Sequence, residues 1–183
     1  LGQKSITKFD GYVFLTEEMN TLVNTSGKPY VITECIVDVN MSKSFNNISN
    51  KSFPRVCLYA GAVKKIYGIP QMVEGFIRAD IKDAELHIYG SGDFKEELRE
   101  ICKKHSNVKY YGVVPNEVVV ENELKATLLV NPRPAEGEYT KYSFPSKNME
   151  YMVSGTPLLG IKLPGIPEEY YQYMYTIDSV YMY

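Results

Sequence analysis

From Arg55 onward, short apolar runs alternate with longer stretches of helical periodicity, and this alternation limits the folds that the chain can adopt. Arg55–Ala60 is an apolar run followed at once by Gly61, which is typical of a buried strand. An amphipathic helix is predicted next, because apolar side chains recur at spacings of three and four residues. They are Ile69, Met72, Val73, Phe76 and Ile77.

The same alternation continues along the rest of the chain. Strands are predicted at residues 85–89, 108–111, 126–130 and 157–160, and helices at residues 94–102, 115–124 and 147–153. Strand and helix units joined by short connections form parallel sheets whose two faces are covered by helices. The sequence therefore predicts an α/β fold with such a sheet.

A polar segment rich in Asn and Ser divides the chain, and we interpret residues 41–53 as a linker. The part ahead of it predicts a strand at 11–15, a helix opening at Thr16 and a second strand near 30–33. Because two strands and one helix cannot bury a core alone, we expect residues 1–40 to be the end of a preceding domain. The chain would then be a piece of a longer protein, and its main domain at 54–183 could be truncated at its C-terminus.

Composition excludes several classes of function. The 183 residues are 44% hydrophobic and 23% charged, with a formal net charge of -2, so no general field attracts nucleic acid. The apolar runs are too short to cross a bilayer and the first residues lack a signal-peptide core, so we expect a cytoplasmic protein. The three cysteines and two histidines complete no metal-ligand pattern, and we expect reduced thiols and no metal. The tyrosines that crowd the C-terminal end are interpreted as a bias of composition.

Two glycine-containing turns follow predicted strands, at the edge where a parallel sheet presents its ligand face. Gly90, Ser91 and Gly92 would let the backbone approach a ligand, but they also fit an ordinary turn in which Asp93 caps the next helix. The other turn begins at Gly61. Its Lys64 and Lys65 could neutralise a diphosphate, although a solvated loop explains either lysine taken singly.

The segment 145–157 predicts a short helix that begins near Pro145 and ends at Gly155. Ser146 is the expected N-cap, and an apolar stripe is expected at Met149, Met152 and Val153. Glu150 lies beside that stripe, one position too late for a capping box. The helix N-terminus favours phosphate, and a carboxylate one turn further can accept two hydrogen bonds from a ribose diol. We favour this interpretation over the alternative in which Ser146 only caps the helix and Glu150 is a surface charge.

In their order and spacing, these motifs resemble the C-terminal half of retaining GT-B-fold glycosyltransferases of the group 1 family, a Rossmann-like nucleotide-sugar-binding domain. The similar segments are 58–61 with 67–69, 86–92, 108–113, 128–133 and 145–157. Residues 1–40 likewise resemble the last strand, helix and strand of that family's acceptor domain.

The resemblance implies roles for individual residues. Glu150 would bind the ribose, Ser146 and Lys147 would meet the diphosphate, and Gly61 would lie near it. Gly90, Ser91 and Gly92 would lie near the nucleotide, with Gly112 and Val113 flanking the base.

The chain departs from the family pattern at three positions. Tyr142 stands where the first of two acids is usual, so the donor sugar would lose a contact or receive it from Glu136 or Glu138. Ala62 and Tyr67 stand where an arginine and a lysine are usual. The candidates for the missing phosphate contact are Lys64, Lys65, Arg133 and Lys147.

The resemblance implies a glycosyltransferase that moves a sugar from a nucleotide-diphosphate donor to a glycan or lipid-linked acceptor, with no cofactor or metal, in bacterial surface polysaccharide synthesis. Retention of configuration follows from the family alone, and no catalytic residue is identified. The fragment alone would be inactive, and the whole protein could contact the inner face of the membrane. Two alternatives stay open: a non-catalytic nucleotide-binding homologue, which the three departures favour, and a sugar-nucleotide epimerase of the same architecture.

Overall fold

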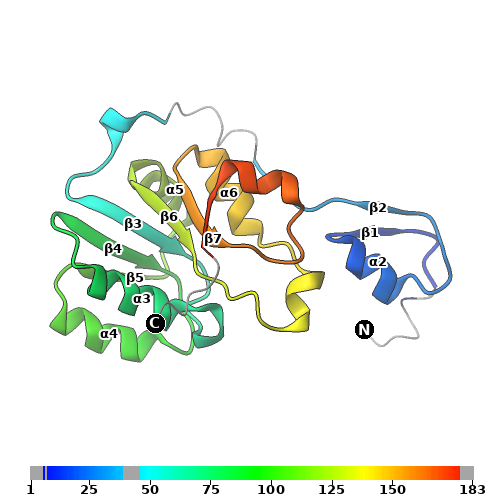
Figure 1. The fold of residues 1–183 in the computed structure, drawn as a ribbon, viewed down its shortest axis with the longest axis horizontal. Helices are drawn as coiled ribbons and strands as arrows, with labels where there is room; N and C mark the ends of the chain where they lie inside the picture. The colour runs from blue at the N-terminus through cyan, green and yellow to red at the C-terminus, as the bar shows by residue number, and fades with distance from the viewer. Residues whose placement is uncertain (1–5, 7, 39–45, 178–183) are drawn as a thin grey trace.

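The computed structural model describes residue 6, residues 8–38 and residues 46–177 (Figure 1). The predicted linker at 41–53 and the predicted boundaries of residues 1–40 and 54–183 fall partly outside the described residues, so the division into domains stays a prediction. Tyr181 and Tyr183 also lie outside them. Within the described part of the chain, no helix is long and apolar enough to cross a bilayer.

A small parallel unit precedes the main sheet and lies to one side of it (Figure 1). It consists of β1 (Tyr12–Phe14), α2 (Glu17–Val23) and β2 (Tyr30–Ile32), and the two strands pair in parallel. Thr16 caps α2, because its side chain accepts a hydrogen bond of 3.3 Å from the Met19 amide. These strands and the helix start agree with the sequence prediction.

The main sheet has six parallel strands in the order β5-β4-β3-β6-β7-β8. Their bounds are β3 Arg55–Ala60, β4 Ala84–Tyr89, β5 Val108–Gly112, β6 Leu128–Asn131, β7 Leu158–Ile161 and β8 Tyr175–Ile177. The predicted α/β fold with a parallel sheet is confirmed. The edge strand β8 was not predicted, because the tyrosines around it were attributed to composition.

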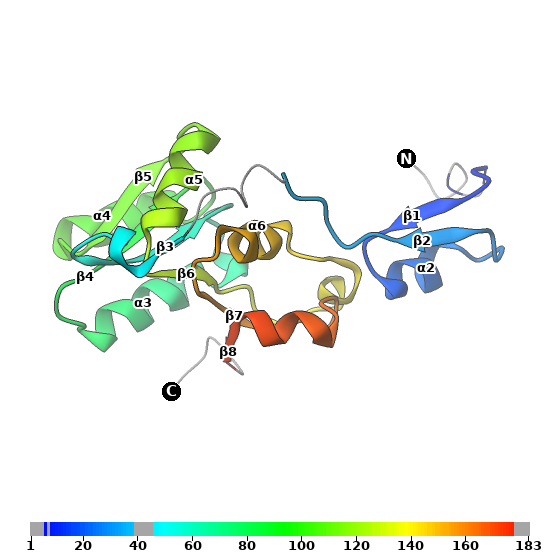
Figure 2. The ribbon, with the colours of Figure 1, turned by 90° about the horizontal axis from the view of Figure 1, so that it is seen from above.

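Helices cover both faces of this sheet. The α-helices are α3 Ile69–Ala79, α4 Lys95–Lys104, α5 Asn116–Lys125 and α6 Ser146–Ser154; the 3-10 turns are η2 Ile48–Asn50, η3 Lys65–Tyr67, η4 Glu138–Tyr142 and η5 Glu168–Tyr173. Val73 of α3 and Leu98 of α4 pack in one core with Tyr59, whereas Val119 of α5 and Tyr151 of α6 pack in another with Leu58. Figure 2 shows α3 on the opposite side of the sheet from α5 and α6.

The strand order changes direction between β3 and β6. From β3 the chain proceeds through β4 to β5 on one side, and from β6 through β7 to β8 on the other. In open parallel sheets, ligands bind beyond the carboxyl ends of the strands at such a switch point.

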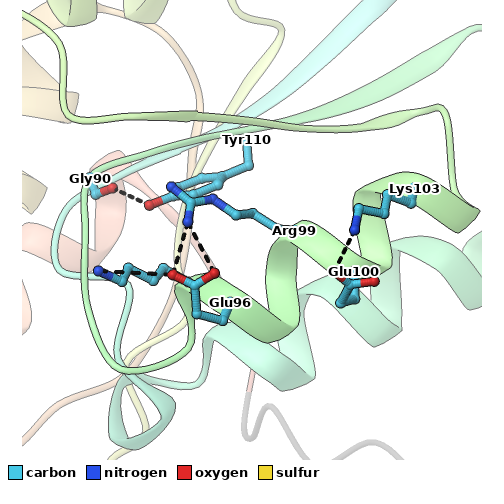
Figure 3. Close-up of polar contacts among 7 residues, drawn as sticks. Gly90, Glu96, Arg99, Glu100, Lys103 and Tyr110 are labelled. Carbon is cyan, nitrogen blue, oxygen red and sulfur yellow. Dashed lines mark hydrogen bonds and ion pairs between the residues drawn. The ribbon is translucent and has the colours of Figure 1, made fainter.

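Close backbone contacts hold together the two glycine-containing turns at this edge. A Cβ at Gly90, where φ is +120°, would lie 1.8 Å from the Gly61 carbonyl oxygen, and a Cβ at Gly92 would lie 2.1 Å from that of Val63. The Tyr110 hydroxyl of β5 donates a hydrogen bond of 2.8 Å to the Gly90 carbonyl (Figure 3). Glycine is therefore required in the turn after β4 because the turn after β3 packs directly on it.

Arg99 of α4 supports this arrangement from outside. Its guanidinium lies 5.8 Å from the Tyr110 ring centroid and donates a hydrogen bond of 2.8 Å to Glu96 (Figure 3). The tyrosine that holds the Gly90 turn is thus itself covered by a cation.

Two glycine substitutions should have opposite effects on stability. Gly90→Ala should lower the free energy of unfolding by about 2–4 kcal/mol, because it adds both backbone strain and a backbone clash. Gly75→Ala is the matched control within α3, where an added Cβ meets nothing within 4 Å. It should raise that free energy by about 0.5–1 kcal/mol, because alanine loses less entropy in a helix. Urea denaturation measures both, and equal effects would contradict the packing described.

Candidate functional site

The candidate site lies where β3 and β6 separate. β3 pairs with β6 at Cys57 and Leu58, whereas its pairing with β4 continues to Ala60. On the β6 side, the Ala60 amide donates a hydrogen bond of 2.8 Å to the Tyr151 hydroxyl, which in turn donates one of 3.2 Å to the Ala60 carbonyl. Tyr151 is completely buried. Its side chain therefore replaces a sheet partner and fixes α6 against the end of β3.

A pocket of about 210 Å³ opens beside this anchor. It is formed by the carboxyl ends of β3 and β6, the segment after each strand, and the N-terminal turn of α6. Its lining residues are Tyr59, Ala60, Gly61, Ala62, Tyr67, Asn131, Arg133, Phe144, Pro145, Ser146, Lys147 and Tyr151. The pocket thus occupies the switch point of the sheet, where a ligand is expected.

Arg133 is one of two cationic side chains in the pocket wall. Its guanidinium lies 5.3 Å from the ring centroid of Tyr67 and 5.2 Å from that of Tyr139, and it donates a hydrogen bond of 3.1 Å to the Ser143 hydroxyl. Its Nε is buried, and the described residues offer it no hydrogen-bond partner. The planar group is held in place by the two rings, so a guanidinium that suits an anion is already oriented in the pocket wall.

Lys147 is the other cation, and it lies between two carboxylates. Its Nζ is 2.7 Å from Glu150 Oε2 and 3.4 Å from Glu123 Oε1, and 5.9 Å from the Tyr151 ring centroid. Glu123, on α5, is fully buried. Burial raises the pKa of Glu123 to about 7, although the nearby Lys147 ammonium acts in the opposite direction.

The structure brings four of the predicted site residues into the pocket wall: Gly61, Arg133, Ser146 and Lys147. Glu150 is one turn further along α6, and its side chain is 20% exposed and paired with Lys147. In the described part of the chain, the other predicted site residues do not line the pocket. They are Lys64, Lys65, Gly90, Ser91, Gly92, Gly112, Val113 and Tyr142.

The residues outside the wall have other contacts. Lys65 forms an ion pair with Glu97, and Lys64 Nζ lies 5.9 Å from the Tyr67 ring centroid. Gly90 and Gly92 pack against the turn after β3, as described above. Val113 is 77% exposed. Glu138, a candidate substitute for the acid missing at position 142, is exposed and paired with Lys141. Roles of these residues toward a ligand stay predictions.

Two predictions about α6 are wrong. Pro145, not Ser146, occupies the N-cap of α6, and Ser146 is the first helical residue. The fully buried face of α6 carries Asn148, Tyr151 and Ser154, not the predicted stripe of Met149, Met152 and Val153. Hydrogen bonds explain why this face is buried. Tyr151 bonds to Ala60, and Asn148 accepts a hydrogen bond of 2.5 Å from Asn131. The predicted end at Gly155, where φ is +69°, is confirmed.

Asp93 is likewise not the cap of α4, because Phe94 precedes that helix. Its carboxylate accepts a hydrogen bond of 2.9 Å from the Lys65 amide and so joins the turn after β4 to the turn after β3. The alternative interpretation of Asp93 as an N-cap is therefore wrong, and the residue supports the loop that begins at Gly61.

Glu123 and Tyr151 are the residues that sequence reasoning missed. A signal for Glu123 was present, since Val119 and Glu123 are four residues apart and the buried face of α5 consists of these two. Tyr151 gave a weaker signal, because a tyrosine within a methionine-rich helix fits a simple apolar face equally well. Within the described residues, no group of three or more His, Cys, Asp or Glu side chains is arranged to hold a metal ion. The prediction of a metal-free reaction stays a prediction.

Removing the Tyr151 hydroxyl should destabilise the fold. In Tyr151→Phe, the buried Ala60 amide and carbonyl lose their partner, which should cost about 1–3 kcal/mol. Tyr173→Phe is the matched control, because Tyr173 is 65% exposed. Chemical denaturation of both variants measures the difference, and an unchanged midpoint for Tyr151→Phe would show that Ala60 finds another partner.

Comparisons with known proteins agree with this fold. A family model described as "Glycosyl transferases group 1" matches residues 54–177. Among solved structures, the pneumococcal O-GlcNAc transferase GtfA, in complex with UDP and GlcNAc, superposes with a TM-score of 0.67 at 21% identity, covering 88% of this chain and 32% of that chain.

Two further solved structures share the fold. Sucrose-phosphate synthase from Thermosynechococcus elongatus has a TM-score of 0.67 at 17% identity, covering 91% of this chain and 45% of that chain. The C-terminal domain of a group 1 glycosyl transferase, LpcC from Francisella tularensis, has a TM-score of 0.55 at 18% identity and covers 68% of each chain. No curated protein sequence matches. This chain spans about a third of GtfA. It belongs to the group 1 family of glycosyl transferases and has the Rossmann-like fold of a GT-B domain.

Proposed function

We propose that this chain is the donor-binding part of a glycosyltransferase that moves a sugar from a nucleoside diphosphate to a glycan or lipid-linked acceptor. The observation that carries the proposal is the pocket at the switch point, which combines Arg133, Lys147 and the N-terminal turn of α6. A negatively charged group suits this combination, because the positive end of the helix dipole and two cationic side chains face the same space.

The diphosphate would occupy this pocket as the leaving group. Negative charge builds on it while the glycosidic bond breaks, and preorganised cations and helix amides stabilise that charge. Arg133 is suited to this role, since its guanidinium is already held between Tyr67 and Tyr139. In this proposal, Arg133 and Lys147 make the phosphate contacts that the family usually assigns to positions 62 and 67.

Glu150 would bind the ribose of the donor. It lies one turn into α6 with its side chain 20% exposed, so a ligand that enters beside the helix N-terminus can reach it. Its carboxylate pairs with Lys147 in the structure described here. Donor binding would exchange this ion pair for hydrogen bonds from the ribose diol, while Lys147 turns toward the phosphates.

Solved structures with the same fold support the choice of donor and acceptor classes to be tested. GtfA is described in complex with UDP and GlcNAc, and WaaB as a lipopolysaccharide outer core galactosyltransferase. We extend these classes to the whole protein as part of the proposal, with retention of configuration and a place in bacterial surface polysaccharide synthesis. A cytoplasmic location, with contact to the inner face of the membrane, belongs to the same proposal.

A non-catalytic nucleotide-binding homologue is the competing function. Tyr142 favours it, since neither that residue nor Glu136 or Glu138 is part of the pocket wall in the residues that the structure describes. Turnover of a donor panel by the full-length protein separates the two. Transfer to an acceptor supports the enzyme, whereas nucleotide binding with neither transfer nor hydrolysis supports the homologue. Epimerisation of the donor sugar without any acceptor would point to an epimerase.

The pocket assignment predicts which substitutions weaken nucleotide binding. Calorimetric titration with UDP, GDP, ADP and CMP should identify a preferred nucleotide. Arg133→Gln and Glu150→Ala should each weaken its binding by about 1.5–3 kcal/mol, roughly tenfold or more, because each removes a hydrogen bond to a charged group. Arg78→Gln is the matched control, as this arginine is exposed in the last turn of α3. Unchanged affinity in Arg133→Gln would contradict the assignment of this pocket as the nucleotide site. Unchanged affinity in Glu150→Ala would contradict only the ribose contact.

A further inference from the structure

We propose that Glu123 is a positioning residue for Lys147: its buried carboxyl group holds the ammonium at the pocket wall and, by its protonation, sets how much positive charge an anionic ligand meets. The proposal rests on the function proposed above, because it takes a phosphate-bearing ligand to be the occupant of the pocket. It concerns a residue that lies on α5, outside the pocket wall.

The geometry gives Glu123 one close contact toward the site. Its Oε1 lies 3.4 Å from Lys147 Nζ, and its Oε2 is buried and finds no hydrogen-bond partner among the described residues. The side chain is fully buried, whereas that of Lys147 is 30% exposed. A buried carboxyl group with an unpartnered oxygen is costly to fold, and its remaining contact points to the ammonium that lines the pocket.

The backbone around Glu123 is fixed independently of that contact. The Thr156 hydroxyl donates a hydrogen bond of 2.8 Å to the Glu123 carbonyl. Lys51 Nζ donates to the same hydroxyl at 2.9 Å and to the Leu124 carbonyl at 3.0 Å. The end of α5 is therefore held in place, and the side chain of Glu123 is fully buried, which leaves its carboxyl group little room to move.

Three charged or titratable groups on α6 face Glu123: Lys147, Glu150 and Tyr151. From the segment before β3, Lys51 approaches the backbone of the same turn. With both carboxylates ionised, the cluster of Glu123, Lys147 and Glu150 carries one positive and two negative charges, a net charge of -1. With Glu123 protonated, the net charge is zero. An anion entering the pocket is repelled less in the second state.

The sign of the pH dependence follows from this charge. Because the bound anion favours protonated Glu123, binding raises the pKa of Glu123 further and takes up a proton. The pKa of free Glu123 is about 7. The contribution of Glu123 to affinity is therefore most favourable below pH 7 and falls as the pH rises through the range above it.

The test compares nucleotide affinity at pH 6 and pH 8 for the chain and for Glu123→Gln. UDP, GDP and ADP are titrated, and the tightest binder is used. The phosphate of the nucleotide titrates equally with both proteins, so the difference between them reports Glu123. If binding raises the pKa of Glu123 by one unit, the unaltered chain should lose about fivefold more affinity than Glu123→Gln between the two pH values.

Two further variants separate positioning from general damage. Glu121→Gln removes an exposed charge from the same helix, where Glu121 pairs with Lys125 at 2.6 Å, and should leave the pH dependence of the unaltered chain unchanged. Glu123→Gln keeps an oxygen for Lys147 and should bind at pH 6 within about twofold of the unaltered chain, because the hydrogen bond is retained. Glu123→Leu removes the contact with Lys147 as well as the charge, so it should bind more weakly than Glu123→Gln at both pH values.

The proposal is overturned if Glu123→Gln shows the same pH dependence as the unaltered chain. If Glu123→Gln fails to fold, calorimetry of the unaltered chain in two buffers of different ionisation enthalpy decides. Proton uptake beyond that of the nucleotide's own phosphate at pH 7.5 supports the proposal, and its absence overturns it. If the unaltered chain binds none of the nucleotides, the proposed function fails and this inference fails with it. If the chain binds a nucleotide but Glu123→Gln does not change the pH dependence, only this inference fails.

Discussion

The pair of hydrogen bonds between Tyr151 and Ala60 is the interaction on which the rest of the site depends. At the switch point, β3 extends past the end of its pairing with β6, and buried backbone groups must find a partner elsewhere. The Tyr151 hydroxyl supplies that partner for both the amide and the carbonyl of Ala60. Because Tyr151 lies on α6, the same contact brings Ser146 and Lys147 to the end of β3. One side chain thus completes the sheet and places a helix N-terminus beside the opening.

The opposite side of the pocket is held by contacts between backbones. Gly90 and Gly92 allow the turn after β4 to lie directly against the turn after β3. At the start of α3, a Cβ at Gly68 would lie 2.2 Å from the Pro132 carbonyl, so the segment after η3 meets the segment after β6 just as closely. The conformational freedom of glycine is used here for packing loops against one another, and this packing positions Tyr67 beneath Arg133.

The main sheet was predictable because most of its strands and helices carry a local signal. The apolar run of β3 and the periodicity of α3 are properties of neighbouring residues, and both elements form where the pattern places them. The rotation of α6 has a different origin, since it depends on Ala60 and Asn131, which are distant in sequence. The short edge strand β8 leaves Tyr175 exposed and has no alternation that distinguishes it from a loop. The glycine turns were located correctly, but a single sequence does not reveal that they pack on one another.

The arrangement of cations bears on whether Ala62 and Tyr67 imply a lost activity. An aromatic ring at position 67 removes one positive charge from the turn after β3, yet the same ring lies 5.3 Å from the Arg133 guanidinium, which comes from the segment after β6. A ring restricts the rotamers of the cation that packs on it before any ligand binds. That side chain therefore loses less entropy on binding an anion than a free side chain would. If the pocket binds a diphosphate as proposed, its positive charge has moved across the switch point from β3 to β6 and α6. The substitutions at 62 and 67 then describe a different way of binding phosphate, and the question of activity rests on the sugar side of the pocket, where Tyr142 replaces an acid.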